Sequence, residues 1–472
     1  MKIIAVDIGT SRIKVACFDE YGNMSCLHSR RLDRAANPTT QDAREWYSVT
    51  AELLREVTKK IKTPDAVSVT GNMHALLGVD AVGMPVSPAL LWSDNSAKTE
   101  SDTLNDICGK ELLKICGNLS SPVFTLPKIM QMKHKTPELY ARSTSFMQSK
   151  DFISFSLTGV RCTDPVDASG VLGMDIATNS WSDDFFSECG IDIAKLPQIL
   201  PSASICGKVS HNASEFTGLP AGTPVVTGTG DLSSAAVGSG VDKDTVSLTL
   251  GTAGQLLATG KRGDGRLLSG KLFVFAHAAP EQELFLGSVP SGGFSFEWLA
   301  KMHNITVSEF FELASQSELT GTLPIFMPYI LGKGAPSMDY TPAGAWHKLS
   351  ASHSLADLCR GAVFGALSPL RQCADLLESL TGKRKNIILQ ALACREKAVR
   401  ETACELFVQN KRLPENSEAS LLGAAIIGAV ALKKYDSISS ASQKMIKYVD
   451  IPALPTQDAQ ELFEEFLSFA SR

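Results

Sequence analysis

The residue with the clearest chemical potential is Asp231, an aspartate that follows a run of β-branched and glycine residues. The segment 225–230 (VVTGTG) predicts a strand that ends in a tight turn, and the small residues of 232–238 predict a helix with Asp231 as its N-cap. A carboxylate there accepts backbone N–H bonds and is stabilised by the helix dipole, so we expect it to be ionised at neutral pH and able to accept a hydroxyl proton. An ordinary N-cap has the same local sequence, so other motifs must distinguish the two.

Two turns rich in glycine and threonine, far apart in the chain, have similar surroundings. The segments 3–19 and 248–258 both read as strand, turn and strand, with Gly9-Thr10-Ser11 and Gly251-Thr252-Ala253 at the turns. Such a turn presents backbone N–H groups and a hydroxyl, which suit phosphate oxygens. Either turn alone is typical of a simple hairpin. As a pair they can close on one nucleotide from opposite sides, and Asp231 precedes the second.

Length and composition restrict the class of protein. A chain of 472 residues with 44% hydrophobic and 20% charged residues predicts two or three globular domains. A net charge of −5 and a pI near 6.0 give no reason to expect nucleic acid or an anionic membrane as partner. The apolar run 421–432 is too short to cross a bilayer, and no leader is evident, so we expect a cytoplasmic protein. The cysteines and histidines lack metal-ligand spacing, which disfavours a transition-metal site.

An α/β fold follows from the order of the predicted elements. Helical periodicity over 40–62 precedes a strand at 66–70, and ligands of α/β proteins gather at the carboxyl ends of strands. Met73 and His74 lie at such an end, although a lone histidine after a strand commonly has a structural role. Trp92 and Asp94 come together after an apolar segment and could form one wall of a polyol pocket.

Other segments add context without chemistry of their own. The polar segment 163–170 predicts a well-bonded loop that holds its domain together. Composition changes from helix to strands near 237–244, where we place the boundary between two large lobes. The glycine-lysine phosphate loop and the dinucleotide-binding glycine pattern are both missing from the sequence, which disfavours a Walker-type NTPase and a Rossmann dehydrogenase.

In this order the motifs resemble the FGGY family of carbohydrate kinases, within the fold group of actin, hexokinase and the Hsp70 chaperones. The match runs nearly end to end, and Met73-His74 is most similar to the xylulokinase branch. The resemblance implies an α/β fold of two ribonuclease-H-like, actin/hexokinase-like lobes with a cleft between them. Residues 1–240 would form the N-terminal lobe, with the sugar and first phosphate sites. Residues 241–472 would form the C-terminal lobe, with the nucleotide site and a closing helix.

The resemblance also implies an activity, the ATP-dependent phosphorylation of a hydroxyl on a small sugar, a ketopentose such as D-xylulose. Asp231 would be the catalytic base, and Asp7 would organise Mg²⁺ through water. Lys14 reads equally well as a surface strand residue, and a homodimer is compatible with the family. The implied sugar contacts are Met73, His74, Trp92, Asp94 and Asp231, and the implied ATP contacts are Thr10, Ser11, Lys14, Gly251, Thr252, Gly293 and Gly423.

Several positions depart from the family pattern. Gln390-Ala391-Leu392-Ala393 stands where the family usually has Gly-Gly-Gly-Ala beneath the adenosine, and each replacement adds at least a Cβ to that surface. Ser96 replaces a common arginine, and Lys333-Gly334 replaces a common Glu-Arg pair, which should weaken charged contacts. Asn72 and Ala75 replace the usual Gln and Gly beside Met-His.

These departures keep alternative functions open. One is a kinase-derived sugar-binding or regulatory protein with impaired ATP use, and another is a kinase for a different sugar, a polyol or an aldonate such as gluconate. An actin-like or chaperone-like ATPase is a third, but it would leave the Met-His and Trp-x-Asp segments without a purpose beyond packing.

Overall fold

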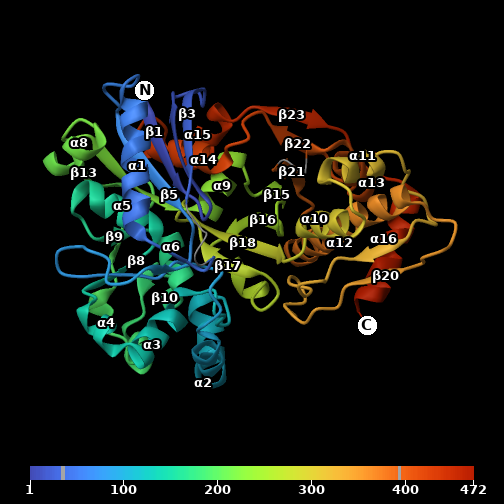
Figure 1. The fold of residues 1–472 in the computed structure, drawn as a ribbon, viewed down its shortest axis with the longest axis horizontal. Helices are drawn as coiled ribbons and strands as arrows, with labels where there is room; N and C mark the ends of the chain where they lie inside the picture. Colours follow the sequence, from blue (N-terminus) through green and yellow to red (C-terminus); the bar gives the residue numbers. More distant parts are fainter. Residues whose placement is uncertain (33–37, 392–394, 472) are drawn as a thin grey trace.

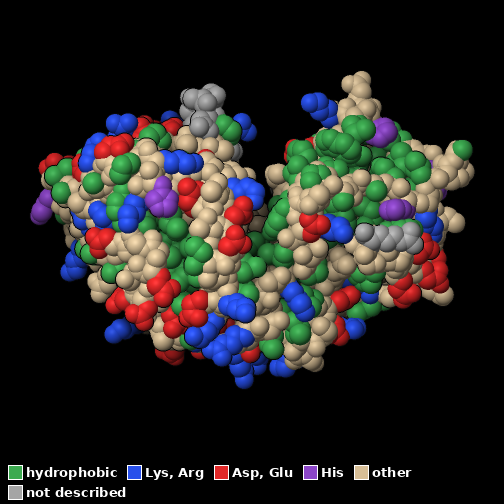
Figure 2. All heavy atoms as spheres, turned by 90° about the horizontal axis from the view of Figure 1, so that it is seen from below, with side chains coloured by type: hydrophobic (Ala, Val, Ile, Leu, Met, Phe, Trp, Pro, Cys, Tyr) green, Lys and Arg blue, Asp and Glu red, His purple; other side chains and the backbone are tan. Residues whose placement is uncertain are grey.

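The computed structural model describes residues 1–32, 38–391 and 395–471, and two mixed β-sheets organise it (Figure 1). Each sheet belongs mainly to one half of the chain, and a deep notch separates two masses of the molecule in the space-filling view (Figure 2). The first sheet consists, in spatial order, of β13 (Ile205–Lys208), β14 (Pro224–Gly230), β5 (Ala66–Gly71), β1 (Ile3–Ile8), β2 (Arg12–Phe18) and β3 (Met24–Arg31).

The second sheet repeats the plan of the first. Its strands, in spatial order, are β17 (Phe273–Ala276), β18 (Gln282–Val289), β16 (Gly254–Lys261), β15 (Thr245–Leu250), β21 (Asn386–Gln390), β22 (Lys411–Pro414) and β23 (Tyr448–Ile451). In both sheets a hairpin, β1–β2 or β15–β16, pairs through its first strand with a parallel neighbour, β5 or β21. The predicted strand-turn-strand segments are therefore confirmed as equivalent hairpins, and the predicted two-lobed fold is confirmed with them.

Helices cover both faces of the first sheet. On one side lie α1 (Ala43–Thr58) and α5 (Ser149–Thr158), and on the other lie α9 (Asp231–Ser239) and α14 (Ala419–Ala431). Helix α1 buries the face that its periodicity predicts, including Trp46 and Leu53. It begins later than the predicted 40–62 because the Asp42 carboxylate caps it by accepting the Arg44 amide. Although α14 comes late in the chain, it packs against β1 and β5.

The second sheet separates two hydrophobic clusters by strand alternation. On β16, Leu256 and Ala258 face the cluster that includes the long helix α12 (Leu355–Thr381), whereas Leu257 faces the opposite cluster. That opposite cluster contains Val166 and Phe124 from the first half of the chain, so this face of the second sheet joins the two halves.

The remaining elements are short strands and helices around the sheets. The helices are α2 (Lys98–Cys116), α3 (Thr125–Lys135), α4 (Pro137–Arg142), α6 (Pro165–Val171), α7 (Asp183–Glu188), α8 (His211–Thr217), α10 (Phe294–Met302), α11 (Val307–Ala314), α13 (Lys397–Leu406), α15 (Ile438–Met445) and α16 (Gln457–Ala470). The short strands are β4 (Thr40–Gln41), β6 (Leu77–Val79), β7 (Ala89–Leu90), β8 (Ser145–Met147), β9 (Cys162–Thr163), β10 (Met174–Asp175), β11 (Ser180–Trp181), β12 (Gln198–Ile199), β19 (Ile325–Met327) and β20 (Ala345–His347). Across the described ranges, no helix combines the length and apolar character needed to span a membrane.

The loop predicted at 163–170 is wrong, because most of this segment is helix α6. The Asp164 carboxylate accepts the amides of Val166 and Asp167, and Pro165 occupies the first helical position.

Two glycines allow α9 and α14 to cross at backbone contact. A Cβ at Gly423 would overlap the carbonyl oxygen of Ser234, and one at Gly238 would overlap the carbonyl oxygen of Ala419. The Ser234 hydroxyl adds a hydrogen bond to the Ser420 carbonyl oxygen at 2.7 Å. Because Gly238 and Gly423 have no side chains, the helix that carries Asp231 packs directly against the backbone of α14.

We expect Gly423→Ala to lower the free energy of unfolding by roughly 2 kcal/mol, because overpacking forces the two backbones apart. Urea unfolding of the purified variant measures this change. The control is Gly109→Ala in α2, where the new Cβ would meet only a Leu119 methyl at 3.4 Å. Equal stability of Gly423→Ala and the parent protein would show that the crossing is not tightly packed.

Candidate active site

Two carboxylates, Asp7 and Asp231, lie at the same edge of the first sheet. The pairing of β1 with β5 aligns Asp7 with Thr70, and the pairing of β14 with β5 aligns Gly230 with Gly71, so the three strands end together. Asp231 is the first residue of α9 and Gly230 is its N-cap, one residue earlier than predicted. The side chain still lies at the positive end of the helix dipole.

Burial raises the pKa of both carboxylates, and the charge of Asp7 adds to the rise at Asp231. For Asp231, removal from solvent and then the charge of Asp7 raise the pKa to about 7, against backbone hydrogen bonds from Leu232 and Met73. For Asp7, burial raises the pKa to about 6, with Lys14 opposing the rise. The prediction that Asp231 is fully ionised at neutral pH is therefore corrected, because desolvation outweighs the hydrogen bonds of the helix terminus. A pKa near the working pH suits a general base.

This pair of carboxylates also fits a hard divalent cation. Mg²⁺ prefers oxygen ligands and retains several waters, so one or two carboxylates together with substrate phosphates suffice to hold it. Within the part of the chain that the structure describes, no group of three or more His, Cys, Asp or Glu side chains could hold a metal. The chemistry of Asp7 and Asp231 therefore matches Mg²⁺ bound largely through water and phosphate oxygens.

Side chains from two other segments donate hydrogen bonds to the first predicted phosphate turn. The Gln41 side-chain amide donates to the Thr10 carbonyl oxygen, and the Trp92 indole donates to the Thr10 hydroxyl at 3.0 Å. Ser11 is exposed next to Thr10, and its carbonyl oxygen accepts the Leu32 amide. Trp92, expected against the sugar, thus also orients a hydroxyl of the phosphate turn.

The second predicted turn packs against the start of α10. The Gly293 amide donates to the Gly251 carbonyl oxygen at 2.8 Å, and the Phe294 amide donates to the Thr252 carbonyl oxygen at 2.9 Å. A Cβ at Gly293 would overlap the Gly251 carbonyl oxygen, which explains glycine at this position. Gly251, Thr252 and Gly293 are therefore together, with Gly251 and Thr252 exposed.

Met73 and His74 lie beside the carboxylates in the loop after β5. Met73 is buried under the turn of Asp231, where a Cβ at Gly230 would meet the Met73 side chain. His74 is buried with a φ of 65°, its Nδ1 is 2.9 Å from the Gly170 carbonyl oxygen, and burial lowers its pKa to about 4. Because that carbonyl can only accept, Nδ1 carries the proton and Nε2 is left as an acceptor.

Asp94 is buried and held by the residue that replaces the family arginine. The Ser96 amide and hydroxyl both donate to Asp94 Oδ1, and the Gln131 side chain holds the Ser96 backbone. The substitution therefore exchanges a long cation for a short group that orients the carboxylate.

Two predicted ATP contacts lie apart from the turns. Lys14 pairs with Asp7 across the β1–β2 hairpin, but its Nζ is 2.5 Å from Glu418 Oε2, which joins β2 to the start of α14. Gly423 lies at the α9–α14 crossing. Both residues therefore contact the scaffold that carries the site.

A buried ionic network beneath β14 was not predicted as part of the site. Lys150 Nζ lies 2.7 Å from Asp151, 3.3 Å from Asp164 and 3.3 Å from Asp167. The Thr229 hydroxyl donates to Asp164 Oδ2 at 2.8 Å, which ties the network to the turn before Asp231. The acidic segment around α6 was the available sequence signal, and its predicted role of holding the domain together agrees with these contacts.

A second missed residue is Lys128, a lysine in an otherwise apolar stretch of α3. Its ammonium donates to the carbonyl oxygens of His74, Leu91 and Val123 at 2.9, 2.7 and 2.9 Å. Burial lowers the pKa of Lys128 to about 7, against the attraction of Asp94. Lys128 therefore joins the Met-His loop to the segment that carries Trp92 and Asp94.

We expect Asp231→Asn to stabilise the protein free of metal and nucleotide, increasingly so at higher pH. An unfolded aspartate titrates near pH 4, whereas folded Asp231 keeps its proton to about pH 7, so its charge makes folding less favourable as pH rises between these values. Urea unfolding in EDTA should show a gain of roughly 1–3 kcal/mol at pH 8 that vanishes near pH 4. Asp106→Asn, at an exposed site of α2, is the control. A gain independent of pH would contradict the raised pKa.

Comparison with known proteins agrees with this geometry. Residues 2–238 match the N-terminal domain of the FGGY family of carbohydrate kinases, and residues 248–432 match its C-terminal domain. A xylulose kinase of Lactococcus lactis subsp. lactis is 28% identical over 479 residues, covering 98% of this chain and 94% of its own.

Solved structures share the fold. The crystal structure of ligand-bound xylulose kinase from Lactobacillus acidophilus superposes with a TM-score of 0.91 at 21% identity, covering 100% of this chain and 98% of its own. A gluconate kinase structure from the same organism also gives 0.91 at 21% identity, covering 100% of this chain and 97% of its own. With both family domains matched in order over most of its length, the chain belongs to the FGGY family of carbohydrate kinases, enzymes that phosphorylate small sugars with ATP.

Proposed function

We propose that the sugar is a ketopentose such as D-xylulose and that Asp231 is the base that activates its hydroxyl. The observation that carries the proposal is the Asp231 carboxylate, which accepts backbone hydrogen bonds from Leu232 and Met73 at the N-terminus of α9 and whose pKa is raised to about 7 by burial and the charge of Asp7. The relatives named xylulose kinase, at 25–28% identity over nearly the whole chain, support the choice of sugar.

The chemistry requires little beyond positioning and charge neutralisation. Asp231 accepts the hydroxyl proton as the sugar oxygen attacks the γ-phosphorus, and the bond to the bridging oxygen breaks to release ADP. Asp7 would hold Mg²⁺, which would supply positive charge to the phosphates. Thr10, Ser11, Gly251 and Thr252 bind phosphate oxygens through amides and hydroxyls, Gly293 supports the second turn, and Lys14 and Gly423 act through the scaffold.

The sugar lies on the side of Asp231 opposite to the phosphates. Its hydroxyls can donate to Asp94 and to His74 Nε2, whose partners on the protein side are already fixed. The exposed indole face of Trp92 and the backbone around Met73 complete the pocket. Lys128 sets the distance between these groups because it bonds to both segments.

A second candidate substrate is an aldonate such as gluconate. Ser96, Asn72 and Ala75 change the surroundings of Asp94 and His74, and the gluconate kinase structure is as similar in fold as the xylulose kinase structure. The absence of nucleic-acid partners, a homodimer, the domain boundary at 240 and a cytoplasmic location stay predictions.

A coupled ADP-release assay with MgATP and a panel of ketoses, aldoses, polyols and aldonates tests the proposal. We expect D-xylulose to give the highest kcat/KM and Asp231→Asn to lower turnover by roughly 10²-fold or more, as for loss of a general base. Asp106→Asn should retain full activity, and a cooperative thermal unfolding transition shows that Asp231→Asn is folded. Normal turnover of Asp231→Asn would rule out Asp231 as the base. A higher kcat/KM for gluconate than for D-xylulose would make gluconate the preferred substrate.

The altered nucleotide segment provides a separate test. Leu392 and Ala393 lie outside the described residues, but Ala391 has a φ of 63°, a conformation that an L-residue adopts at a cost of roughly 1–2 kcal/mol. We expect Ala391→Gly to raise stability by about 0.5–1 kcal/mol, since the greater freedom of unfolded glycine offsets part of the relief. We also expect Ala391→Gly to lower the KM for ATP. Loss of stability would indicate that Ala391 is not strained, and a total lack of ATP binding in both proteins would favour the regulatory alternative.

A further inference from the structure

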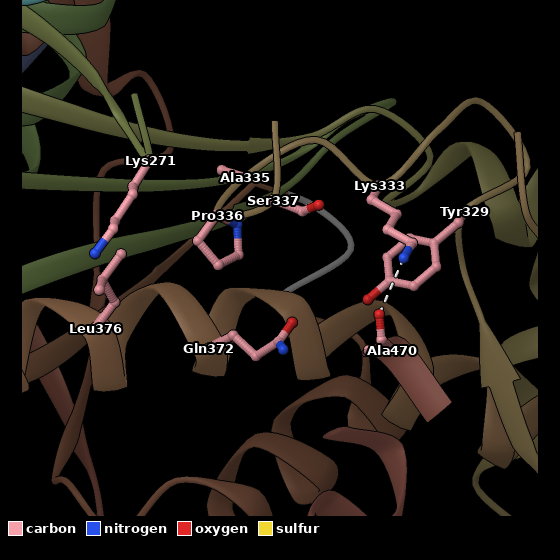
Figure 3. A pocket seen from close by; sticks show the side chains of 9 residues that line it. All are labelled: Lys271, Tyr329, Lys333, Ala335, Pro336, Ser337, Gln372, Leu376 and Ala470. Atoms are coloured by element: carbon pink, nitrogen blue, oxygen red, sulfur yellow. Dashed lines mark hydrogen bonds between the residues drawn. The ribbon is translucent and has the colours of Figure 1, made fainter. Parts of the chain in front are cut away.

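A pocket of about 290 Å³ lies away from the carboxylates, between the loop 333–337 and helix α12 (Figure 3). Asp7, Asp231 and the two phosphate turns do not line it. The residues that do are Lys271, Tyr329, Lys333, Ala335, Pro336, Ser337, Gln372, Leu376 and Ala470.

The polar side chains of this pocket are all able to donate hydrogen bonds. Lys271 and Lys333 approach it on either side of the Ala335–Ser337 loop (Figure 3). The Tyr329 hydroxyl, on a side chain that is 3% exposed, and the Gln372 amide face the same space. Among the described lining residues none is acidic and two are lysines. Outside the lining, hydrogen bonds from Thr341 and, to a smaller extent, the charge of Lys333 lower the pKa of the exposed Asp339.

Lys333 is held in place without losing its capacity to bind. Its Nζ donates to the Ala470 carbonyl oxygen at 3.0 Å and lies 6.0 Å from the centre of the Tyr329 ring. An ammonium has three donors, so two remain for a ligand. Lys271 is exposed, and its side chain has no ion-pair partner in the described parts of the chain. The nearby acid Asp375 is 3.5 Å from Arg371, which occupies its charge.

We propose that this pocket binds a phosphate ester of a small organic molecule. The oxygens of a phosphate dianion match the donors of Lys333 and Tyr329, and Lys271 adds a second positive charge at the other end of the pocket. The volume is many times the roughly 10–15 Å³ that one water molecule needs by the same measure, so the pocket has room for an organic part beside the phosphate. Ala335, Pro336 and Leu376 provide apolar walls for the organic part, and Lys271 at the far end can contact a second oxygen.

The sequence and the hydrogen bonds around the 333–337 loop relate this pocket to the proposed nucleotide site. Lys333 stands where the family often has a glutamate, so the positive charge is a feature of this chain. The Ala335 amide donates to the Ser288 carbonyl oxygen at 2.9 Å, and the Leu331 amide donates to the Ser291 hydroxyl at 2.9 Å. Strand β18 and the residues after it lead directly to Gly293, which supports the second phosphate turn. The ester therefore binds beside the nucleotide-holding segment and outside the cleft.

Isothermal titration calorimetry with D-ribose 5-phosphate tests the site. The titration uses Thr252→Val as background, because weakening the phosphate turn reduces binding in the cleft. We expect one ester per chain, with the same affinity in the parent protein and the background. Affinity should fall at least tenfold with Lys333→Gln and at least threefold with Lys271→Gln, while Lys301→Gln, an exposed lysine on α10, leaves it unchanged.

Several results would overturn the proposal. Lys271 is exposed, so Lys271→Gln remains informative even if Lys333→Gln unfolds, which a thermal melt detects. Absence of binding, or binding insensitive to both pocket variants, would refute the site. Loss of binding in Thr252→Val alone would assign the ester to the cleft. Inorganic phosphate binding as tightly as the ester would refute the role of the apolar walls.

Discussion

The repulsion between Asp7 and Asp231 is the constraint on which the rest of this structure depends. Two like charges that have lost solvent move apart or become neutral unless a rigid frame holds them. Here the frame is the strand register that ends β1, β5 and β14 at one edge, together with the glycine contact between α9 and α14. The cost of this arrangement is visible in the raised pKa of Asp231, to which burial contributes most and the charge of Asp7 next. The same cost makes the pair receptive to a proton, a divalent cation and a transferring phosphoryl group.

Buried charges elsewhere in the N-terminal half serve the same frame. The Lys150 network holds the end of β14 through Thr229, and Lys128 binds three loop carbonyl oxygens beside the residues that we propose to contact the sugar. Buried ion pairs contribute little net stability, but removal of one partner leaves an unpaired charge. We therefore interpret both lysines as residues that fix the positions of loops. Their effect on the site is geometric.

The sequence predicted the features that follow from local periodicity. The two hairpins, the apolar face of α1 and the buried α14 all follow from repeating patterns, and the paired turns indicated the candidate site. The N-cap of α9 is Gly230, one residue before the predicted Asp231. The error arises because aspartate is a preferred N-cap residue, but here the neighbouring glycine adopts the capping conformation. The segment 163–170 contains Asp164 followed by Pro165, a helix-start signal that its polar composition obscured.

What could not be predicted depends on contacts between distant segments. The pKa of Asp231 depends on Asp7, more than two hundred residues away in sequence, and on the solvent excluded by the fold. Likewise, the partners of Lys128 are carbonyl oxygens, which have no signature in the sequence. The pocket around Lys333 combines a loop, α12 and the end of α16. From the sequence, Lys333 in place of the family glutamate predicts only weaker charged contacts, and the pocket that it lines is evident only from the fold.

The measurement that tests the account most directly is a carboxylate titration by carbon-13 NMR, with labelled aspartate, on protein free of metal and nucleotide. The resonance absent from Asp231→Asn identifies Asp231, and the account predicts that it titrates near pH 7. Asp7→Asn removes the neighbouring charge, so the same resonance should then titrate at lower pH. Titration near pH 4 in the parent protein, unchanged by Asp7→Asn, would contradict the account, because the two carboxylates would then not share one buried space.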